Sequence, residues 1–161
     1  MKNIQIFFLL LSFSVFSQST LEKAEKLYAQ KKYNEAEKLF SEHLKSHPNH
    51  TKTIEYLGDI AGHQKKWDAA ITNYKKLKVC YPKNANYWYK YGGALGMKAK
   101  ESNKFKALGL IGEVKESFEK AIELNPKHIE ARWALIMVYI QLPGIVGGSE
   151  TKAIKYSNEL L

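Results

Sequence analysis

Glycine-rich segments that lead into a helix are candidate phosphate sites, and one lies near the C-terminus. It reads PGIVGGSETKA, from Pro143 to Ala153. Free backbone N–H groups at a helix start, aided by the helix dipole, can hold an anion. The alternative is a turn between two helices, in which Gly147 and Gly148 permit unusual backbone angles and Ser149 caps the second helix. The surrounding elements decide between the two.

Nucleotide-binding signatures are incomplete at both glycine-rich segments of the chain. GGSETK, residues 147–152, lacks the adjacent glycine and lysine of a P-loop, and GLIGEVK, residues 109–115, lacks its glycine spacing and its hydroxyl. No cysteine has the context of a nucleophile, and no histidine pairs with a carboxylate on a recognisable scaffold. We therefore expect no catalytic residues, no cofactor and no enzyme activity.

Three histidines close together are candidate zinc ligands. They are His43, His47 and His50, and the first two are one helical turn apart, a spacing that can chelate zinc. Glu42 is the only acidic residue beside them, and no cysteine accompanies them. The segment also ends a helix, where exposed histidines interact favourably with the helix dipole. We predict exposed histidines and no metal site.

The chain repeats itself with a period of 34 residues. YNEAEKLFSEHLKSHPNH, residues 33–50, aligns with WDAAITNYKKLKVCYPKN, residues 67–84. Four pairs of residues share this spacing: Tyr33 and Trp67, Ala36 and Ala70, Phe40 and Tyr74, and Pro48 and Pro82. Similarity at one fixed period indicates an array of stacked structural units.

Two further copies follow. The third ends with Phe118, Ala121 and Pro126 at the spacing found in the second copy. Pro126 lies 44 residues after Pro82, so the third copy is ten residues longer than the period. A fourth copy begins at Ile129 and is incomplete.

Each copy has the pattern of two amphipathic helices. In the second copy, apolar residues recur at helical spacing on both sides of the polar break HQKK, residues 63–66. Proline closes each of the first three copies because it cannot continue a helix. Small residues fall where paired helices would cross: Ala36, Gly58, Ala70 and Gly92.

These features resemble the tetratricopeptide-repeat family, whose 34-residue helix-turn-helix pattern has W, L, G, Y, A, F, A and P at fixed offsets. The second copy supplies Leu57, Gly58, Ala70, Tyr74 and Pro82, and the third supplies Trp88, Gly92, Phe118, Ala121 and Pro126. The first copy departs from the pattern, with Ala24 at the glycine position and His43 where alanine is usual.

The resemblance implies an all-α fold, a right-handed α-solenoid of about three and a half to four stacked repeats. The predicted repeats are approximately residues 18–50, 51–84, 85–128 with the ten-residue expansion, and 129–161, which is incomplete. Arrays of this kind bind extended peptides or partner helices on a concave face, which comes mostly from the first helix of each repeat. We therefore expect a non-catalytic adaptor or scaffold for a protein or peptide segment.

The family's concave offsets assign ten residues of this chain to a binding groove. They are Lys52, Glu55, Asp59, His63, Asn86, Tyr89, Met97, Trp133, Met137 and Gln141. This gives a polar, partly acidic half and an apolar half that suits an amphipathic or proline-containing partner. In the alternative interpretation, Tyr89 and Trp133 only fill the space between neighbouring repeats.

Capture of a chaperone's C-terminal carboxylate is not predicted. Family members that do this use a lysine, asparagines and an arginine at defined positions. Here those positions are Leu21, Glu25, Tyr56, Asn86 and Lys90. Only Lys90 is cationic, and Glu25 would repel a carboxylate.

A lysine-rich stretch in the expansion supports an alternative function. Four lysines come just before the apolar segment ALGLIG: Lys98, Lys100, Lys104 and Lys106. Such a stretch could dock on an anionic membrane or envelope surface. In the simpler interpretation it lengthens a helix pair, with the lysines outside and four apolar residues inside: Phe105, Leu108, Leu110 and Ile111.

The first residues have the composition of a secretory signal peptide. Lys2 is followed by a nearly unbroken apolar run from Ile4 to Phe16, and Val15-Phe16-Ser17 fits a cleavage site. The run is shorter than the roughly 20 apolar residues that span a bilayer. We predict cleavage of residues 1–17 and an exported chain, periplasmic or secreted and soluble, with the repeat domain in residues 18–161.

Charge and cysteine content restrict the partners. The formal net charge is +9, which favours anionic partners. Export makes acidic proteins, anionic lipids or charged envelope polymers the expected ones, and no nucleic acid. Cys80 is the only cysteine and has no intramolecular partner. We predict that it is buried and inert, with an intermolecular disulfide as the alternative.

The fourth copy has no closing proline and no capping helix. Because repeat arrays normally need a polar cap, we expect a partner or a second copy of the chain to cover this end, or a longer functional chain. The segment PGIVGGSETKA falls between the two halves of this copy, and Ala153 lies five residues later than the period requires. We therefore predict an enlarged turn, which resembles a PGI-x-GGS turn in a group of exported bacterial proteins of the same family.

Overall fold

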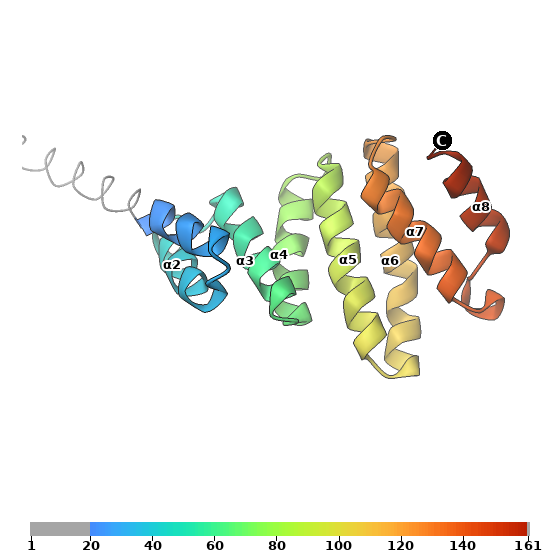
Figure 1. Ribbon diagram of the computed structural model, residues 1–161, viewed down its shortest axis with the longest axis horizontal. Coiled ribbons are helices and arrows are strands. Elements are labelled where there is room, and N and C mark those ends of the chain that lie inside the picture. The colour runs from blue at the N-terminus through green and yellow to red at the C-terminus, as the bar shows by residue number, and fades with distance from the viewer. Residues whose placement is uncertain (1–19, 161) are drawn as a thin grey trace, which may run out of the picture. The chain divides into compact units, whose positions relative to one another are not determined.

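Helices are the only regular secondary structure in residues 20–160, the part of the chain that the computed structural model describes (Figure 1). Residues 20–29 are helical, and the labelled helices are α2 (Tyr33–Ser46), α3 (Thr51–His63), α4 (Trp67–Cys80), α5 (Ala85–Glu101), α6 (Lys104–Leu124), α7 (Ile129–Gln141) and α8 (Glu150–Asn158). A short 3-10 helix, η1 (Gly144–Val146), separates α7 from α8. The predicted all-α class is confirmed.

The chain divides into two compact units after Ile60, inside α3. We call the described part of the first, residues 20–60, the first unit, and that of the second, residues 61–160, the second unit. Two helices fall within each of the four predicted repeats, whose boundaries stay a prediction.

Proline ends the helices as the sequence pattern predicts. Each of the four prolines comes two positions after the last residue of a helix: Pro48 after α2, Pro82 after α4, Pro126 after α6 and Pro143 after α7. Proline has no N–H to donate and its ring clashes with a preceding helical turn, so the helix cannot continue.

The first unit packs around Phe40, which is fully buried. The ring of Phe40 stacks on that of Tyr56, with centroids 4.7 Å apart. Ala24 and Ala36 are also fully buried. Because their side chains are single methyl groups, the helix at residues 20–29 and α2 can approach closely.

In the second unit, α5 and α6 approach closely at Gly92. A Cβ atom at this position would lie 2.8 Å from the Cβ of Ser117 and 3.1 Å from the ring of Phe118. A small residue is therefore needed where the two helices meet, as predicted. Phe118 and Val114 fill the adjacent core and are 3% and 0% exposed.

The ten-residue expansion lengthens this helix pair. Helix α5 has 17 residues and α6 has 21, whereas α7 has 13. The indole N–H of Trp67, the first residue of α4, donates to Glu101, the last residue of α5. The chain after Glu101 therefore extends past the start of α4, and Asn103 then caps α6 by accepting from the N–H of Lys106.

This extension corrects one prediction. Phe105 and Leu108 were expected inside, but they are 89% and 46% exposed. Leu110 and Ile111 are half-buried. Apolar residues at helical spacing become buried only where a neighbouring element covers the helix, and the first turns of α6 lie beyond α4.

The predicted signal peptide, residues 1–17, lies outside the described residues, and its cleavage stays a prediction. Within residues 20–160, no helix combines the length and the apolar character that crossing a membrane requires.

Candidate functional site

A hollow of about 610 Å³ lies in the second unit, bordered by residues of α4, α5, α6 and α7. We call it the groove. Its walls are aromatic rings and methionine side chains: Trp67, Tyr74, Tyr89, Met97, Phe118 and Met137. Helices from successive repeats supply these side chains, so the groove is a product of their stacking.

The charge of the groove is one-sided. Lys90 and Lys100 line it, and among the described residues no carboxylate does. An apolar wall with two ammonium groups attracts a segment that carries both apolar and anionic groups.

Tyr89 connects the groove to the core. Its ring is half-buried and lies 6.0 Å from that of Phe118 and 4.9 Å from that of His128, measured between centroids. Burial raises the pKa of the Tyr89 hydroxyl, with a smaller contribution from Glu130. The hydroxyl therefore stays protonated at neutral pH and can donate a hydrogen bond to a bound segment.

The structure brings together four of the ten residues assigned to the binding surface. Tyr89, Met97, Met137 and Gln141 line the groove. Three others belong to the first unit: Lys52, Glu55 and Asp59. The remaining three lie apart from the groove wall: His63 is exposed at the end of α3, Asn86 borders a shallower hollow beside Lys127 and His128, and Trp133 faces another hollow.

Several groove residues were missed because the sequence pattern places them in the core. Trp67, Tyr74 and Phe118 come from the second helices of their repeats, whereas the concave offsets select the first helices. Tyr74 and Phe118 are 6% and 3% exposed, so each belongs to the core and also forms the floor of the groove. An aromatic residue that recurs at the same position of each repeat predicts a buried side chain, but it does not predict that the side chain lines a hollow.

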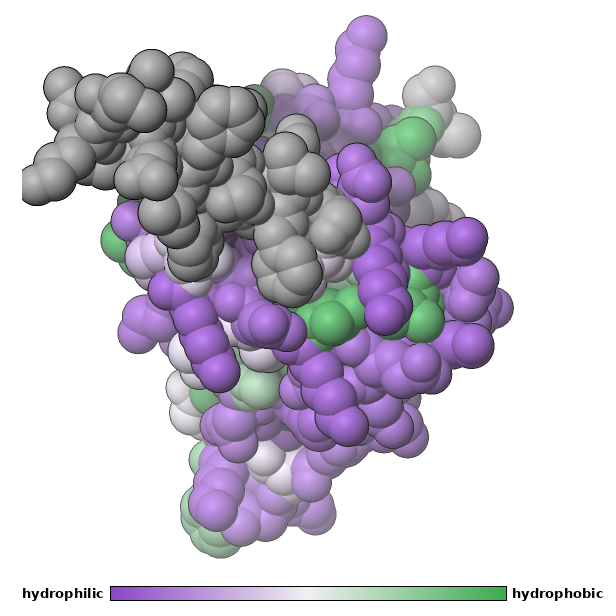
Figure 2. Space-filling view, turned by 90° about the vertical axis from the view of Figure 1, so that its left-hand side faces the viewer, coloured by the Kyte–Doolittle hydropathy of each residue, from purple (hydrophilic) through white to green (hydrophobic). Residues whose placement is uncertain are grey.

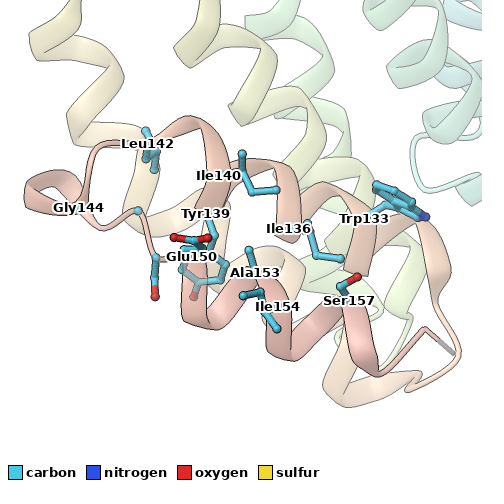
Figure 3. A pocket seen from close by; sticks show the side chains of 12 residues that line it. Trp133, Ile136, Tyr139, Ile140, Leu142, Gly144, Glu150, Ala153, Ile154 and Ser157 are labelled. Carbon is cyan, nitrogen blue, oxygen red and sulfur yellow. The ribbon is translucent and has the colours of Figure 1, made fainter.

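A second hollow, of about 650 Å³, lies on α7 and α8 and is shown in Figure 3. We call it the terminal hollow. Trp133, Ile140 and Ile154 line it and are 55%, 61% and 54% exposed, while Ile136 and Tyr139 form its buried floor. In Figure 3 these side chains come from the two neighbouring helices and gather on one face of the pair.

The segment PGIVGGSETKA is an enlarged turn, as predicted. Gly147 has a left-handed backbone with φ of 93°, and a Cβ atom on Gly148 would lie 1.8 Å from the carbonyl oxygen of Leu142. Ser149 caps α8 by accepting from the N–H of Lys152. Both glycines and the serine are therefore explained by the path of the backbone.

The N–H groups of the turn itself are not available to a phosphate. The turn's consecutive N–H groups already donate to carbonyl oxygens: Val146 and Gly148 to Pro143, Gly147 to Gly144, and Ser149 to Tyr139. The amine of Lys115 approaches it too, donating to the Gly147 carbonyl at 3.4 Å. A cradle needs N–H groups that point at the ligand, and these four point into the turn.

The histidine cluster corrects another prediction. His43 is 7% exposed rather than on the surface. Its ring stacks on His47 at 4.5 Å and meets His50 edge-on at 4.9 Å. Burial lowers the pKa of His43, and the neighbouring rings of His47 and His50 lower it further. Within residues 20–160, no group of three or more metal-ligating side chains has the geometry of a metal site.

The four lysines of the lysine-rich segment differ in their contacts. Lys98 forms an ion pair with Asp68 of α4. The other three lysines form no ion pair with any described residue: Lys100, Lys104 and Lys106.

The prediction of a buried Cys80 is wrong. Cys80 is exposed and is the last residue of α4. Its neighbour Val79 is also exposed, because it lies two positions after the buried Leu77 and therefore on the opposite side of the helix.

No protein-family model matches the sequence, and neither does any curated protein. Solved structures do match. A thermophilic TPR protein, TTC0263 from Thermus thermophilus, is similar with a TM-score of 0.70 and 20% identity, over 90% of this chain and 73% of that one. MamA from Desulfovibrio magneticus RS-1 gives a TM-score of 0.74 and 17% identity, over 89% of this chain and 73% of that one.

A third similar structure contains a peptide. It is the first TPR of Spaghetti (RPAP3) bound to the HSP90 peptide SRMEEVD, with a TM-score of 0.62 and 21% identity, over 76% of this chain and 89% of that one. At these identities the likeness establishes the fold.

Proposed function

We propose that this chain, which has the tetratricopeptide-repeat fold, is an exported, non-catalytic adaptor that holds a protein or peptide segment in its groove. The observation that carries the proposal is the groove itself, a hollow of about 610 Å³ walled by aromatic and methionine side chains. A structure of the same fold was solved with a peptide bound, which supports the use of this fold as a protein-interaction scaffold.

The lining indicates the partner. Rigid aromatic rings and adaptable methionines suit apolar anchors of a peptide or an amphipathic helix. Lys90 and Lys100 are the charged side chains of the wall, so the segment should carry acidic residues near those anchors.

A matched pair of variants on α7 tests this proposal. Met137 and Ile140 are 42% and 61% exposed, but Met137 lines the groove and Ile140 lines the terminal hollow. Peptides selected on the wild-type chain from a display library would be titrated by fluorescence polarisation. We expect Met137→Glu to weaken binding more than about tenfold, because a carboxylate enters the apolar wall and repels an acidic peptide.

The control variant Ile140→Glu should leave the affinity unchanged. If Ile140→Glu or Trp133→Ala abolishes binding while Met137→Glu does not, the site lies at the terminal hollow and the groove proposal is wrong. If the selected peptides contain no acidic residues, the prediction of an acidic partner is wrong, although the groove can still be the binding site.

Export is proposed from residues 1–17 and is tested by sequencing the N-terminus of the protein found outside the cytoplasm. We expect a chain that starts near residue 18 and is located in the periplasm or medium. A chain that keeps residues 1–17 would contradict cleavage.

Self-association is a separate proposal, and it rests on the exposed apolar side chains of the terminal hollow. A second copy could cover Trp133, Ile140 and Ile154. Sedimentation should then show a dimer that Ile140→Glu dissociates, while Ile129→Glu, on the same helix and 56% exposed, does not. A concentration-independent monomer would contradict it.

Association with an anionic membrane or envelope surface through the lysine-rich segment 98–106 is the second candidate function. Apart from Lys100, which also lines the groove, it uses a different surface, and the exposure of Phe105 among these lysines favours it.

A further inference from the structure

The first turns of α6 expose an apolar stripe. Phe105 and Leu108 are 89% and 46% exposed. Gly109 and Gly112 continue the same face at helical spacing, and a Cβ atom on either would meet no other atom within 4 Å. Open solvent therefore covers this face of α6 in the described structure, although the sequence pattern assigned its large side chains to the core.

Lysines flank this stripe on both sides. Lys104 and Lys106 precede and follow Phe105, so their side chains leave the helix about 100° to either side of its ring. Both are exposed, and neither pairs with a carboxylate of the described chain, whereas Lys98, further back on α5, is held by Asp68. The lysine pair is thus a local positive charge that belongs to no ion pair of the described chain.

The stripe lies at a projecting end of the hairpin. Helix α6 has eight residues more than α7, which corresponds to about 12 Å of helix. Figure 1 shows the α5–α6 turn reaching lower than the ends of α4 and α7. In Figure 2, which keeps the same vertical direction, the lower end of the second unit shows hydrophobic and hydrophilic surface side by side.

A second exposed apolar side chain comes from the next turn along the chain. Helices α5 to α8 run alternately down and up in Figure 1, so the α5–α6 and α7–α8 turns lie at the same edge of the second unit. Ile145, in η1, is 96% exposed. Backbone geometry explains the glycines and the serine of that turn, but it does not require an isoleucine at this position.

We propose that this edge of the second unit docks on an anionic lipid surface, with Phe105 and Leu108 entering the headgroup region and Lys104 and Lys106 binding lipid phosphates. The edge projects, and its exposed apolar side chains line none of the hollows described for the second unit: Phe105, Leu108 and Ile145. Apolar side chains flanked by lysines match the boundary between acyl chains and anionic headgroups. The proposal rests on the second candidate function, which it narrows to a lipid surface and to these side chains, and it is independent of the groove.

Vesicle binding tests the proposal with two matched pairs of variants. Lys83 and Lys127 are exposed at the opposite end of the same hairpin, where they precede α5 and follow α6. The double variants Lys104→Gln/Lys106→Gln and Lys83→Gln/Lys127→Gln therefore remove equal charge from opposite edges. Lys100 stays unchanged because it also lines the groove.

The measurement is co-sedimentation with phosphatidylcholine vesicles, with and without phosphatidylglycerol. We expect the partition coefficient on anionic vesicles to fall about 30-fold for the 104/106 variant, since each lysine near such a surface contributes roughly fivefold. The 83/127 variant should change it little. Phe105→Ser should lower it about tenfold, whereas Ile129→Ser, an exposed apolar side chain at the opposite edge, should not.

All variants carry the same N-terminus, so residues 1–17 contribute equally whether kept or removed. Thermal unfolding should be unchanged, because the altered side chains are exposed. If both double variants lower the partition coefficient equally, the effect depends only on net charge, and the proposal is overturned. Equal binding to neutral vesicles, or binding to soluble polyglutamate but not to vesicles, would overturn it too. Affinity for groove peptides should be the same in all these variants.

Discussion

Helices α2 and α6 are the second helices of the first and third repeats, and they present equivalent positions to their cores with different chemistry. Phe40 in α2 and Phe118 in α6 are equivalent, and both are buried. Three positions later, α2 has His43 and α6 has Ala121, which are 7% and 0% exposed. The repeat pattern thus determines which positions are buried. The residue at each buried position determines how the stability of that unit depends on pH.

Removing the shared aromatic ring should have the largest effect. We expect Phe118→Ala to lower the free energy of unfolding by about 3–5 kcal/mol, because it leaves a cavity beneath the groove. Phe40→Ala should cost a similar amount in the first unit. Urea denaturation followed by circular dichroism measures both. A loss below about 1 kcal/mol for either would mean that the two positions are not equivalent.

The second-largest effect is expected from a methyl group added where the two helices of a repeat cross. The equivalent position is Ala24 in the first repeat and Gly92 in the third. Gly92→Ala should destabilise the protein by about 1–3 kcal/mol, because the new Cβ would overlap the Cβ of Ser117. Ala24 already carries this methyl group and is fully buried. If Gly92→Ala stabilises the protein in the same denaturation assay, α5 and α6 are not in close contact.

Acid should affect the first unit through His43. The pKa of His43 is lowered in the folded chain, first by burial and then by His47 and His50. In the unfolded chain His43 takes up a proton near its ordinary pKa of 6.5, whereas in the folded chain it does so only at lower pH. Protonation therefore favours the unfolded chain. The stability that the first unit has above pH 6.5 is lost as the pH falls below this value.

Hydrogen exchange of α2 amides between pH 7.5 and 5.5 would detect this loss. His43→Leu introduces the residue that the second repeat has at the equivalent position, Leu77. This variant should remove most of the pH dependence of the stability. Equal sensitivity of the wild type and this variant would exclude His43 as the source.

The smallest effect is expected at the turns between paired helices. Lys31 and Lys65 are 34 positions apart and have φ of 59° and 57°, in the left-handed region that glycine adopts most easily. Lys31→Gly and Lys65→Gly should each stabilise the protein by about 0.5–1 kcal/mol, measured as an upward shift of the melting temperature. Destabilisation by either would show that the lysine side chain stabilises its turn by more than the backbone strain costs.

Local and periodic features of the fold could be predicted from the sequence. The prolines mark where helices end, and Ser149 and the glycines mark the enlarged turn. Each of these assignments depends on the chemistry of one residue or on its immediate neighbours. The all-α class is predicted from apolar residues at helical spacing within each copy and from the family resemblance that the 34-residue period carries.

The burial of some side chains and the position of the hollows could not be predicted, because both depend on neighbouring elements that the repeat period does not specify. Phe105 and Leu108 have the spacing of core residues, but no described element covers the projecting part of α6. His43 is polar, which predicts exposure, although its repeat position is a core position. Tyr89 and Trp133 share a concave offset but line different hollows, because α7 of the following repeat completes the groove beside Tyr89, whereas Trp133 lies on α7 itself.

The enlarged turn should also have distinctive dynamics. Its amides at Val146, Gly147, Gly148 and Ser149 are all hydrogen-bonded, and the last returns to Tyr139, whose own hydroxyl donates to Glu119 of α6. A surface loop of this length would ordinarily exchange its amide protons quickly. Here exchange should be slow, because opening the turn breaks bonds that tie it to α7 and, through Tyr139, to α6.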